Sequence, residues 1–99
     1  MKSPKECQNI EDVRNAIDQL DTNIIELLGK RFQYVKEIVK YKPTDKKSIV
    51  ALPRLNAVIS SRRELASQNG LSPDVIENVY RMLIDYFIAE EEKLITPIK

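Results

Sequence analysis

Four basic residues of this sequence stand where they could bind a small dianion together. Arg31 stands in one long apolar repeat, and Arg14 lies on the flank of that repeat. Lys42 and Arg54 flank the loop that follows that repeat. A guanidinium binds a carboxylate through two parallel hydrogen bonds. The chain has no His and one Cys, so it lacks an ordinary zinc site, a His-based catalytic group and an internal disulfide. These residues therefore indicate chemistry that depends on fixed positive charge, with neither a metal nor a nucleophile.

The apolar repeat that contains Arg31 predicts one long helix from Asn9 to Tyr41. Its positions recur at steps of three and four and comprise Ile10, Val13, Ile17, Leu20, Ile24, Leu27, Arg31, Tyr34 and Ile38. Asn9 is the expected N-cap, and Glu11 and Asp12 suit the positive end of the helix dipole. Such a helix would be about 50 Å long, whereas a compact domain of this size is only about 26 Å across. We therefore expect an exposed apolar stripe that needs a partner.

Two shorter helices are predicted in the second half of the chain. Pro53 begins the first, which ends at the C-cap signature Asn69-Gly70. Ser72-Pro73-Asp74 caps the second, which Pro97 should end. The sequence thus predicts an all-α fold of three helices, long, short and medium, in a single domain over residues 1–99.

The segments outside these helices are short. Ser3-Pro4-Lys5-Glu6 has the spacing of a capping box and predicts a short helical lead-in. Cys7 follows it and is interpreted as a small packing residue, since nothing nearby would activate its thiol. Residues 42–52 form the only extended loop, whose length fits a lid over a site as well as a plain connector.

The composition excludes several classes of partner. The net charge of +1 over 99 residues gives no general drive towards nucleic acid or an anionic membrane. No apolar run reaches the roughly 18–20 residues of a membrane span, and the N-terminus lacks the core of a signal peptide. A cytoplasmic location is therefore expected.

Arg31 stands in the repeat where an aliphatic residue is expected. Its stem could pack while its charged head reaches solvent, or it could pair with a Glu across a dimer seam. The functional alternative is a receptor for an anion. Arg14 and Arg31 start about 25 Å apart on one helix and point in directions about 100° different. One chain therefore cannot bring both to the same small ligand.

Two antiparallel copies of the helix would remove this obstacle. With a two-fold axis near Thr22-Asn23, Arg14 of one copy falls opposite Arg31 of the other, and two identical sites result. Lys42 could close over each site from the loop, and Arg54 faces the same loop. Such a site suits a reaction that needs a dianion held in one conformation and fixed donors at a developing charge. Unimolecular pericyclic reactions have this requirement, and no metal or organic cofactor is implied.

A series of short motifs covers nearly the whole sequence. They are Ser3-Pro4 with Cys7, Arg14-x-Ala16-Ile17-Asp18-x-x-Asp21, Leu28-Gly29-Lys30-Arg31, Tyr34-Val35-Lys36, Lys42, Pro53-Arg54, Glu64-x-Ala66, Asn69-Gly70-Leu71 and Ile88-Ala89-Glu90. In these motifs the sequence resembles the all-helical, type II chorismate mutase family. The resemblance implies an intertwined homodimer of three-helix chains. It also implies a small dianionic substrate, isochorismate or chorismate, while the composition given above indicates no nucleic acid or membrane partner.

The resemblance further implies a role for each of the four cations. Arg14 would arrive from the partner subunit, and Arg31 would bind a substrate carboxylate. Lys42 would act in catalysis by donating to the carboxylate and the ether oxygen of the enolpyruvyl group. Arg54 would hold the ring side of the site, and the loop after Lys42 would become ordered over the ligand.

Three departures from the mutase pattern favour a lyase. Leu55 stands where a mutase carries a Glu for the ring hydroxyl, and Ile88 replaces a small hydroxyl residue. No acidic residue stands shortly before Arg54, where the chain has Val50, Ala51 and Leu52. The expected activity is the pericyclic cleavage of isochorismate to salicylate and pyruvate, which supplies salicylate for siderophores, with weak mutase activity beside it. The alternatives are a chorismate mutase that forms prephenate and a catalytically inactive helical dimer.

Glu91 departs from the lyase pattern as well, because a Gln that donates to the ether oxygen is usual at this position. An ionised Glu only accepts hydrogen bonds and would repel a dianion. Glu91 must therefore be protonated to bind substrate and assist catalysis, or it must turn away from the site. The remaining interpretation is a solvated charge at the helix end, with a salt bridge to Lys93 or Arg14.

Overall fold

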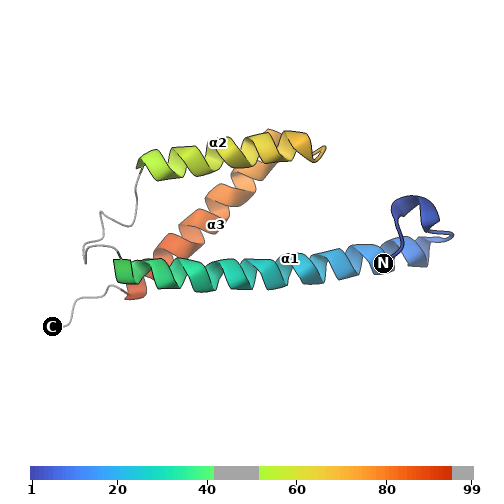
Figure 1. The fold of residues 1–99 in the computed structure, drawn as a ribbon, viewed down its shortest axis with the longest axis horizontal. Coiled ribbons are helices and arrows are strands. Elements are labelled where there is room, and N and C mark those ends of the chain that lie inside the picture. Colours follow the sequence, from blue (N-terminus) through green and yellow to red (C-terminus); the bar gives the residue numbers. More distant parts are fainter. Residues whose placement is uncertain (42–51, 95–99) are drawn as a thin grey trace. The chain divides into compact units, whose positions relative to one another are not determined.

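The computed structural model describes residues 1–41 and 52–94. Within these ranges all regular structure is helical (Figure 1), and the elements are η1 (Pro4–Glu6), α1 (Ile10–Ile38), η2 (Val39–Tyr41), α2 (Leu52–Gln68) and α3 (Pro73–Leu94). The all-α class and the order long, short, medium are confirmed. The chain divides into two compact units, Met1–Tyr34 and Val35–Lys99, and each is described by itself. None of the described helices combines the length and the apolar character that a membrane crossing requires.

Helix α1 begins where its capping residue predicts. Asn9 Oδ1 accepts a hydrogen bond from the backbone N–H of Asp12 at 2.8 Å, which satisfies one of the free donors of the first turn. The α-helical segment ends at Ile38, three residues before the predicted end at Tyr41. The last three residues continue as the 3-10 turn η2, a tighter form that is common at helix ends.

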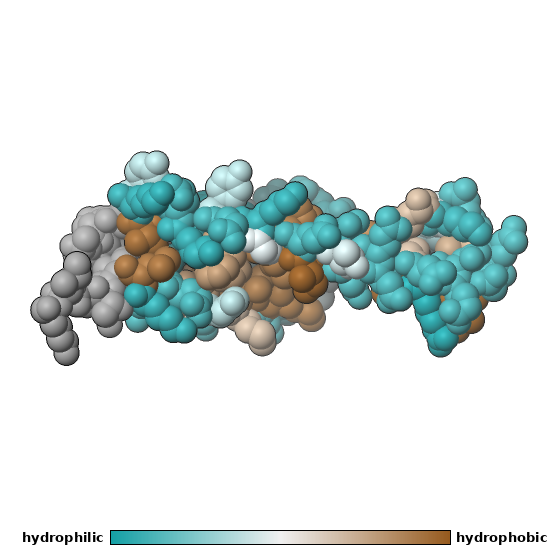
Figure 2. Space-filling view, turned by 90° about the horizontal axis from the view of Figure 1, so that it is seen from below, coloured by the Kyte–Doolittle hydropathy of each residue, from teal (hydrophilic) through white to brown (hydrophobic). Residues whose placement is uncertain are grey.

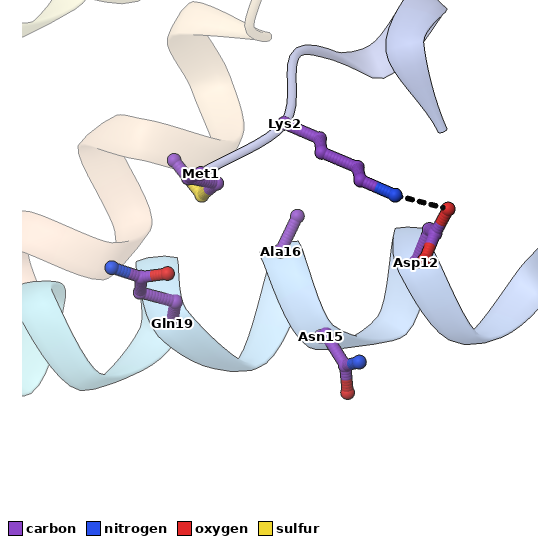
Figure 3. Close-up of a pocket in the computed structure, with 6 residues that line it drawn as sticks. All are labelled: Met1, Lys2, Asp12, Asn15, Ala16 and Gln19. Carbon is purple, nitrogen blue, oxygen red and sulfur yellow. Dashed lines mark hydrogen bonds and ion pairs between the residues drawn. The ribbon is translucent and has the colours of Figure 1, made fainter. Parts of the chain in front are cut away.

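The N-terminal segment is tied to the first turn of α1. Asp12 Oδ2 accepts hydrogen bonds from the Gln8 backbone N–H and from Lys2 Nζ, each at 3.0 Å. The Gln8 N–H, and secondarily the Lys2 ammonium, lower the pKa of the Asp12 carboxyl. Figure 3 shows the Lys2–Asp12 pair beside a hollow of about 210 Å³, towards which Ala16 and Gln19 point.

The predicted capping box in this lead-in is confirmed. The Ser3 backbone N–H donates to Glu6 Oε1 at 3.0 Å, as the reciprocal contact of a capping box requires. Hydrogen bonds from Ser3, its side chain first and its backbone N–H second, lower the pKa of Glu6. Cys7 is half-buried as a free thiol, and its Sγ lies 3.5 Å from the Ser3 carbonyl oxygen.

The apolar stripe of α1 is exposed, as predicted. Its large side chains keep between 43% and 79% of their surface accessible, and they are Ile10, Val13, Ile17, Leu20, Ile24, Leu27, Tyr34 and Ile38. In Figure 2 brown, apolar side chains show at the surface among teal, polar ones. A continuous apolar face of this extent normally marks an interaction surface. The described chain therefore leaves on α1 a face that a partner would bury.

Helices α2 and α3 form a hairpin joined by a tight turn (Figure 1). The hairpin holds all the buried apolar residues of the described part, Val58, Ile59, Ala66 and Phe87. Ser72 caps α3, because its Oγ accepts from the Val75 N–H at 3.3 Å, as predicted.

The end of α2 is a Schellman motif. The Leu71 N–H donates to the Ala66 carbonyl at 2.8 Å, and the Gly70 N–H donates to the Ser67 carbonyl at 3.3 Å. Gly70 has a φ of 73°, which L-residues other than Gly rarely adopt. The predicted C-cap at Asn69-Gly70 is therefore confirmed by its hydrogen bonds.

An ionic network joins the two helices of the hairpin near the turn. Arg63 lies 2.9 Å from Asp74 Oδ1 and 2.8 Å from Glu77 Oε1, while Arg81 Nε lies 2.8 Å from Glu77 Oε2. Arg81 and Arg63 lower the pKa of Glu77, and Asp74 and Glu77 raise the pKa of Arg63. These contacts fix how α2 and α3 face each other at this end.

Substitution of each of the two glycines by Ala is expected to change the free energy of unfolding in opposite directions. Gly70→Ala should lower the free energy of unfolding by about 1 kcal/mol, because the positive φ strains any side chain while no atom lies within 4 Å of the new Cβ. Gly29→Ala, in the interior of α1 and equally unobstructed, should raise it by about 0.5–1 kcal/mol. Urea unfolding followed by circular dichroism measures both. Equal shifts of the same sign would contradict this account.

Candidate active site

The structure places Arg14 and Arg31 on one continuous helix, α1. Arg14 is exposed, and its Nη1 lies 3.3 Å from Glu11 Oε1, a surface pair of little energetic weight. Arg31 is half-buried, and its Nη1 is shielded from solvent. The two residues keep the axial separation of about 25 Å that a helix dictates. The prediction that one chain cannot use both on one small ligand therefore follows from the observed helix.

Arg54 and Leu55 lie at the start of α2, and Ile88 and Glu91 lie near the end of α3. Because the two helices run in opposite directions from the turn, both pairs belong to the end of the hairpin away from Gly70 (Figure 1). Arg54 is exposed and forms no ion pair with any residue of the described ranges. The helix ends away from the turn therefore carry these residues within a single unit, and the two helices diverge towards these ends in Figure 1.

Glu91 is the charged residue that the fold buries. Only 6% of its surface is accessible, and no other polar or charged residue of the described part is classed with it as buried. Glu91 continues the apolar face of α3 that Ile84, Phe87 and Ile88 form at steps of three and four. The interpretation of Glu91 as a solvated charge is therefore wrong, because its position on α3 belongs to the inward face.

The salt bridge from Glu91 to Lys93 or Arg14, which the same interpretation named, stays a prediction. Lys93 Nζ lies 3.0 Å from Glu90 Oε1, and Arg14 lies near Glu11. A buried carboxyl group is costly as an ion unless it is compensated, so its placement points to a function or a specific contact. The burial of Glu91 could have been predicted from the apolar repeat of α3, since Glu91 falls four residues after Phe87 and three after Ile88.

Lys42, the residue predicted to donate to the ether oxygen, lies outside the described residues. Most of the predicted lid, residues 42–51, lies outside them too. The structure therefore places Arg14, Arg31, Arg54, Ile88 and Glu91 and leaves the role of Lys42 as a prediction. Among the described residues no group of three or more His, Cys, Asp or Glu is arranged to hold a metal ion.

Sequence comparison defines the class of protein. Residues 13–92 match the family Chorismate mutase type II. This match covers all of α2 and nearly all of α1 and α3. It includes Arg14, Arg31, Lys42, Arg54, Ile88 and Glu91. The chain therefore belongs to the chorismate mutase type II family.

Three individual proteins are similar in sequence to this chain, and they differ in how much of their own length the chain covers. The chain is 36% identical over 93 residues to an isochorismate pyruvate lyase of Pseudomonas aeruginosa, which covers 94% of this chain and 91% of that protein. It is 34% identical over 84 residues to the T-protein of Haemophilus influenzae, and 26% identical over 82 residues to a bifunctional chorismate mutase/prephenate dehydratase of Buchnera aphidicola. The chain covers only 22% and 21% of the latter two proteins, so they compare with it as one segment.

Proposed function

We propose that this chain is an isochorismate–pyruvate lyase, which cleaves isochorismate to salicylate and pyruvate. The observation that carries the proposal is the correspondence to a lyase over 91% of that protein's length, at 36% identity. Leu55 and Ile88 support the same branch, because neither can act as a polar receptor for the ring hydroxyl of chorismate. The supply of salicylate to a siderophore belongs to the same proposal and rests on the resemblance. A cytoplasmic location is proposed with it, on the sequence criteria for membrane spans and signal peptides given above.

The proposed reaction is a single concerted step. A hydrogen moves from a ring carbon to the methylene carbon of the enolpyruvyl group while the bond between the ring and the ether oxygen breaks. The methylene becomes the methyl group of pyruvate, the ether oxygen becomes its ketone oxygen, and the ring becomes aromatic. No atom leaves or enters from outside, so the protein needs only to hold the reactive conformer and stabilise the developing charge.

The residues divide these tasks. Arg31 and Arg14 bind the carboxylates, and Arg54 holds the ring side of the substrate. Lys42 and the protonated form of Glu91 donate to the ether oxygen, where negative charge develops. Ile88 packs against the ring. In this arrangement the cations surround the dianionic substrate, and an apolar side chain contacts its ring.

The site requires a homodimer in this proposal, and residues 1–99 act as one domain of it. The exposed stripe of α1 supplies the surface, since two antiparallel copies would bury it. Two subunits are needed because Arg14 and Arg31 are too far apart along α1 to bind one ligand from the same chain. An antiparallel pair of helices places Arg14 of one subunit opposite Arg31 of the other. Each dimer then contains two identical sites.

The function is tested by turnover of both candidate substrates. Purified protein should release salicylate, followed by its fluorescence, from isochorismate at a far higher kcat/KM than it forms prephenate from chorismate. Lys42→Ala should lower kcat by about 100- to 1000-fold, because one preorganised charged donor is lost. A mutase would show the reverse preference, an inactive module would turn over neither substrate, and near-normal turnover by the Lys42 variant would refute the assignment.

Shared sites predict complementation between two inactive variants. Arg14→Ala and Arg31→Ala should each be inactive alone. Their heterodimer contains one site with both arginines and one with neither, so a random mixture should recover about a quarter of the wild-type activity. Co-expression with two different tags allows the doubly tagged dimer to be isolated, and this heterodimer should show about half the activity of the wild-type dimer because one of its two sites is complete.

The control for complementation is a mixture of Arg31→Ala with a variant that carries both substitutions. This mixture cannot assemble a complete site and should stay inactive. If Arg14 and Arg31 acted within one chain, neither mixture would recover activity, and the arrangement proposed for the dimer would be wrong.

Glu91 predicts a dependence of the rate on pH. Only the protonated carboxyl can donate to the ether oxygen, so kcat/KM should rise as the pH falls. Glu91→Gln supplies a permanent amide donor and should raise kcat/KM at pH 7 about tenfold while it flattens the acidic rise. Glu92→Gln removes the same charge one residue away and should leave the profile unchanged. A flat profile in the wild type, without a gain in the Glu91 variant, would exclude this role.

A further inference from the structure

The hairpin contains a hollow near its turn, away from the candidate active site. Its volume is about 320 Å³, and α2, α3 and the turn between them all contribute to its lining. Leu65, Leu71 and Ile76 supply apolar side chains, and Ala66 beneath them is only 2% exposed. Ile88 lies about 18 Å further along α3 than Ile76, so the hollow is separate from the residues assigned to catalysis.

The turn itself accounts for this hollow. The Schellman bond from the Leu71 N–H to the Ala66 carbonyl brings the chain back over the end of α2. Ala66 has the smallest side chain that could stand at this buried position, and it leaves space between the two helices. The ionic network of Arg63, Asp74 and Glu77 holds the helices at this spacing. The hollow is therefore built by local constraints of the hairpin.

Arg62 gives the hollow its charge. It is the one charged residue of the lining, and its guanidinium carbon lies 5.6 Å from the centre of the Tyr80 ring, a cation–π geometry. Its Nη1 donates to Ser61 Oγ at 2.6 Å, and no carboxylate of the described ranges pairs with it. The adjacent Arg63, in contrast, contacts two carboxylates. Arg62 thus retains N–H donors for an anion beside an apolar surface.

We propose that this hollow is a non-catalytic binding site for a small aromatic carboxylate. Its volume lies at the lower end of the range for small-molecule sites, which are mostly apolar with a few placed polar groups. The carboxylate would pair with the Arg62 guanidinium, and the ring would lie against Leu65, Leu71 and Ile76. The inference does not depend on the proposed reaction, although the product of that reaction belongs to this chemical class.

Titration of the full chain with sodium benzoate, followed by ¹H–¹⁵N NMR, tests the proposal. Saturable shifts should appear at the amides of Leu65, Asn69 and Leu71. Benzamide has the same shape without the charge and should bind at least tenfold more weakly. Because both ligands are compared on the unchanged protein, this result does not depend on any variant folding.

Matched variants then assign the site. Arg62→Gln should weaken benzoate binding at these amides at least tenfold while turnover stays unchanged. Arg81→Gln removes the same charge from the same hairpin outside the lining and should leave the affinity within twofold. Arg31→Gln should likewise leave these shifts in place, which separates the hollow from the candidate active site even if the proposed function fails. Thermal unfolding by circular dichroism confirms that each variant is folded.

Several results would overturn the proposal. One is the absence of shifts at these amides. Others are equal binding of benzamide, or an affinity that Arg62→Gln does not change. Shifts that follow protein dilution instead of benzoate would show that a second copy of the chain covers the hollow, and they would also refute the ligand site.

Discussion

The rigidity of α1 is the constraint on which the rest of the molecule depends. An α-helix fixes both the distance and the relative direction of two side chains on it, and no rotamer change can bring Arg14 and Arg31 to one ligand a few ångströms across. The chain therefore carries two arginines that it cannot bring to one small ligand by itself. Within the proposed function this limit becomes the reason for association, since a two-fold axis brings the two arginines together from different copies.

The distribution of buried and exposed apolar residues also favours association of the chain with a partner. Only Val58, Ile59, Ala66 and Phe87 are buried as a core in the described part, and all of them belong to the α2–α3 hairpin. The hairpin is further held by local devices, namely the Schellman motif at Gly70, the Ser72 cap and the ionic network around Arg63. Helix α1 has no comparable share of buried residues and keeps its apolar stripe exposed. A chain of this size that buries so little apolar surface gains most from a partner.

The sequence predicts the parts of this fold that local chemistry decides. Asn9, Ser72 and Gly70 each mark a helix end through a hydrogen bond or a dihedral angle that involves neighbours within a few residues. The sequence predicts the end of the long helix at Tyr41, whereas α1 ends at Ile38 and the last three residues form the 3-10 turn η2. The apolar repeat does not signal this tightening of the helix end. The pairing of Arg63 with Asp74 and the position of Arg62 over Tyr80 could not be predicted, because they depend on which faces of α2 and α3 meet.

Glu91 shows how the local and the long-range parts of the argument combine. The repeat of α3 places it on the inward face, and the resemblance to the family places an amide donor at the same position. A carboxyl group there has nearly the shape of the amide, so the fold can accommodate it without repacking. The difference lies in its hydrogens, because the amide always carries donors while the carboxyl carries one only when protonated. In a site whose other proposed members are cations that keep their charge at neutral pH, Glu91 is then the group through which pH could change the balance of charge around a bound dianion.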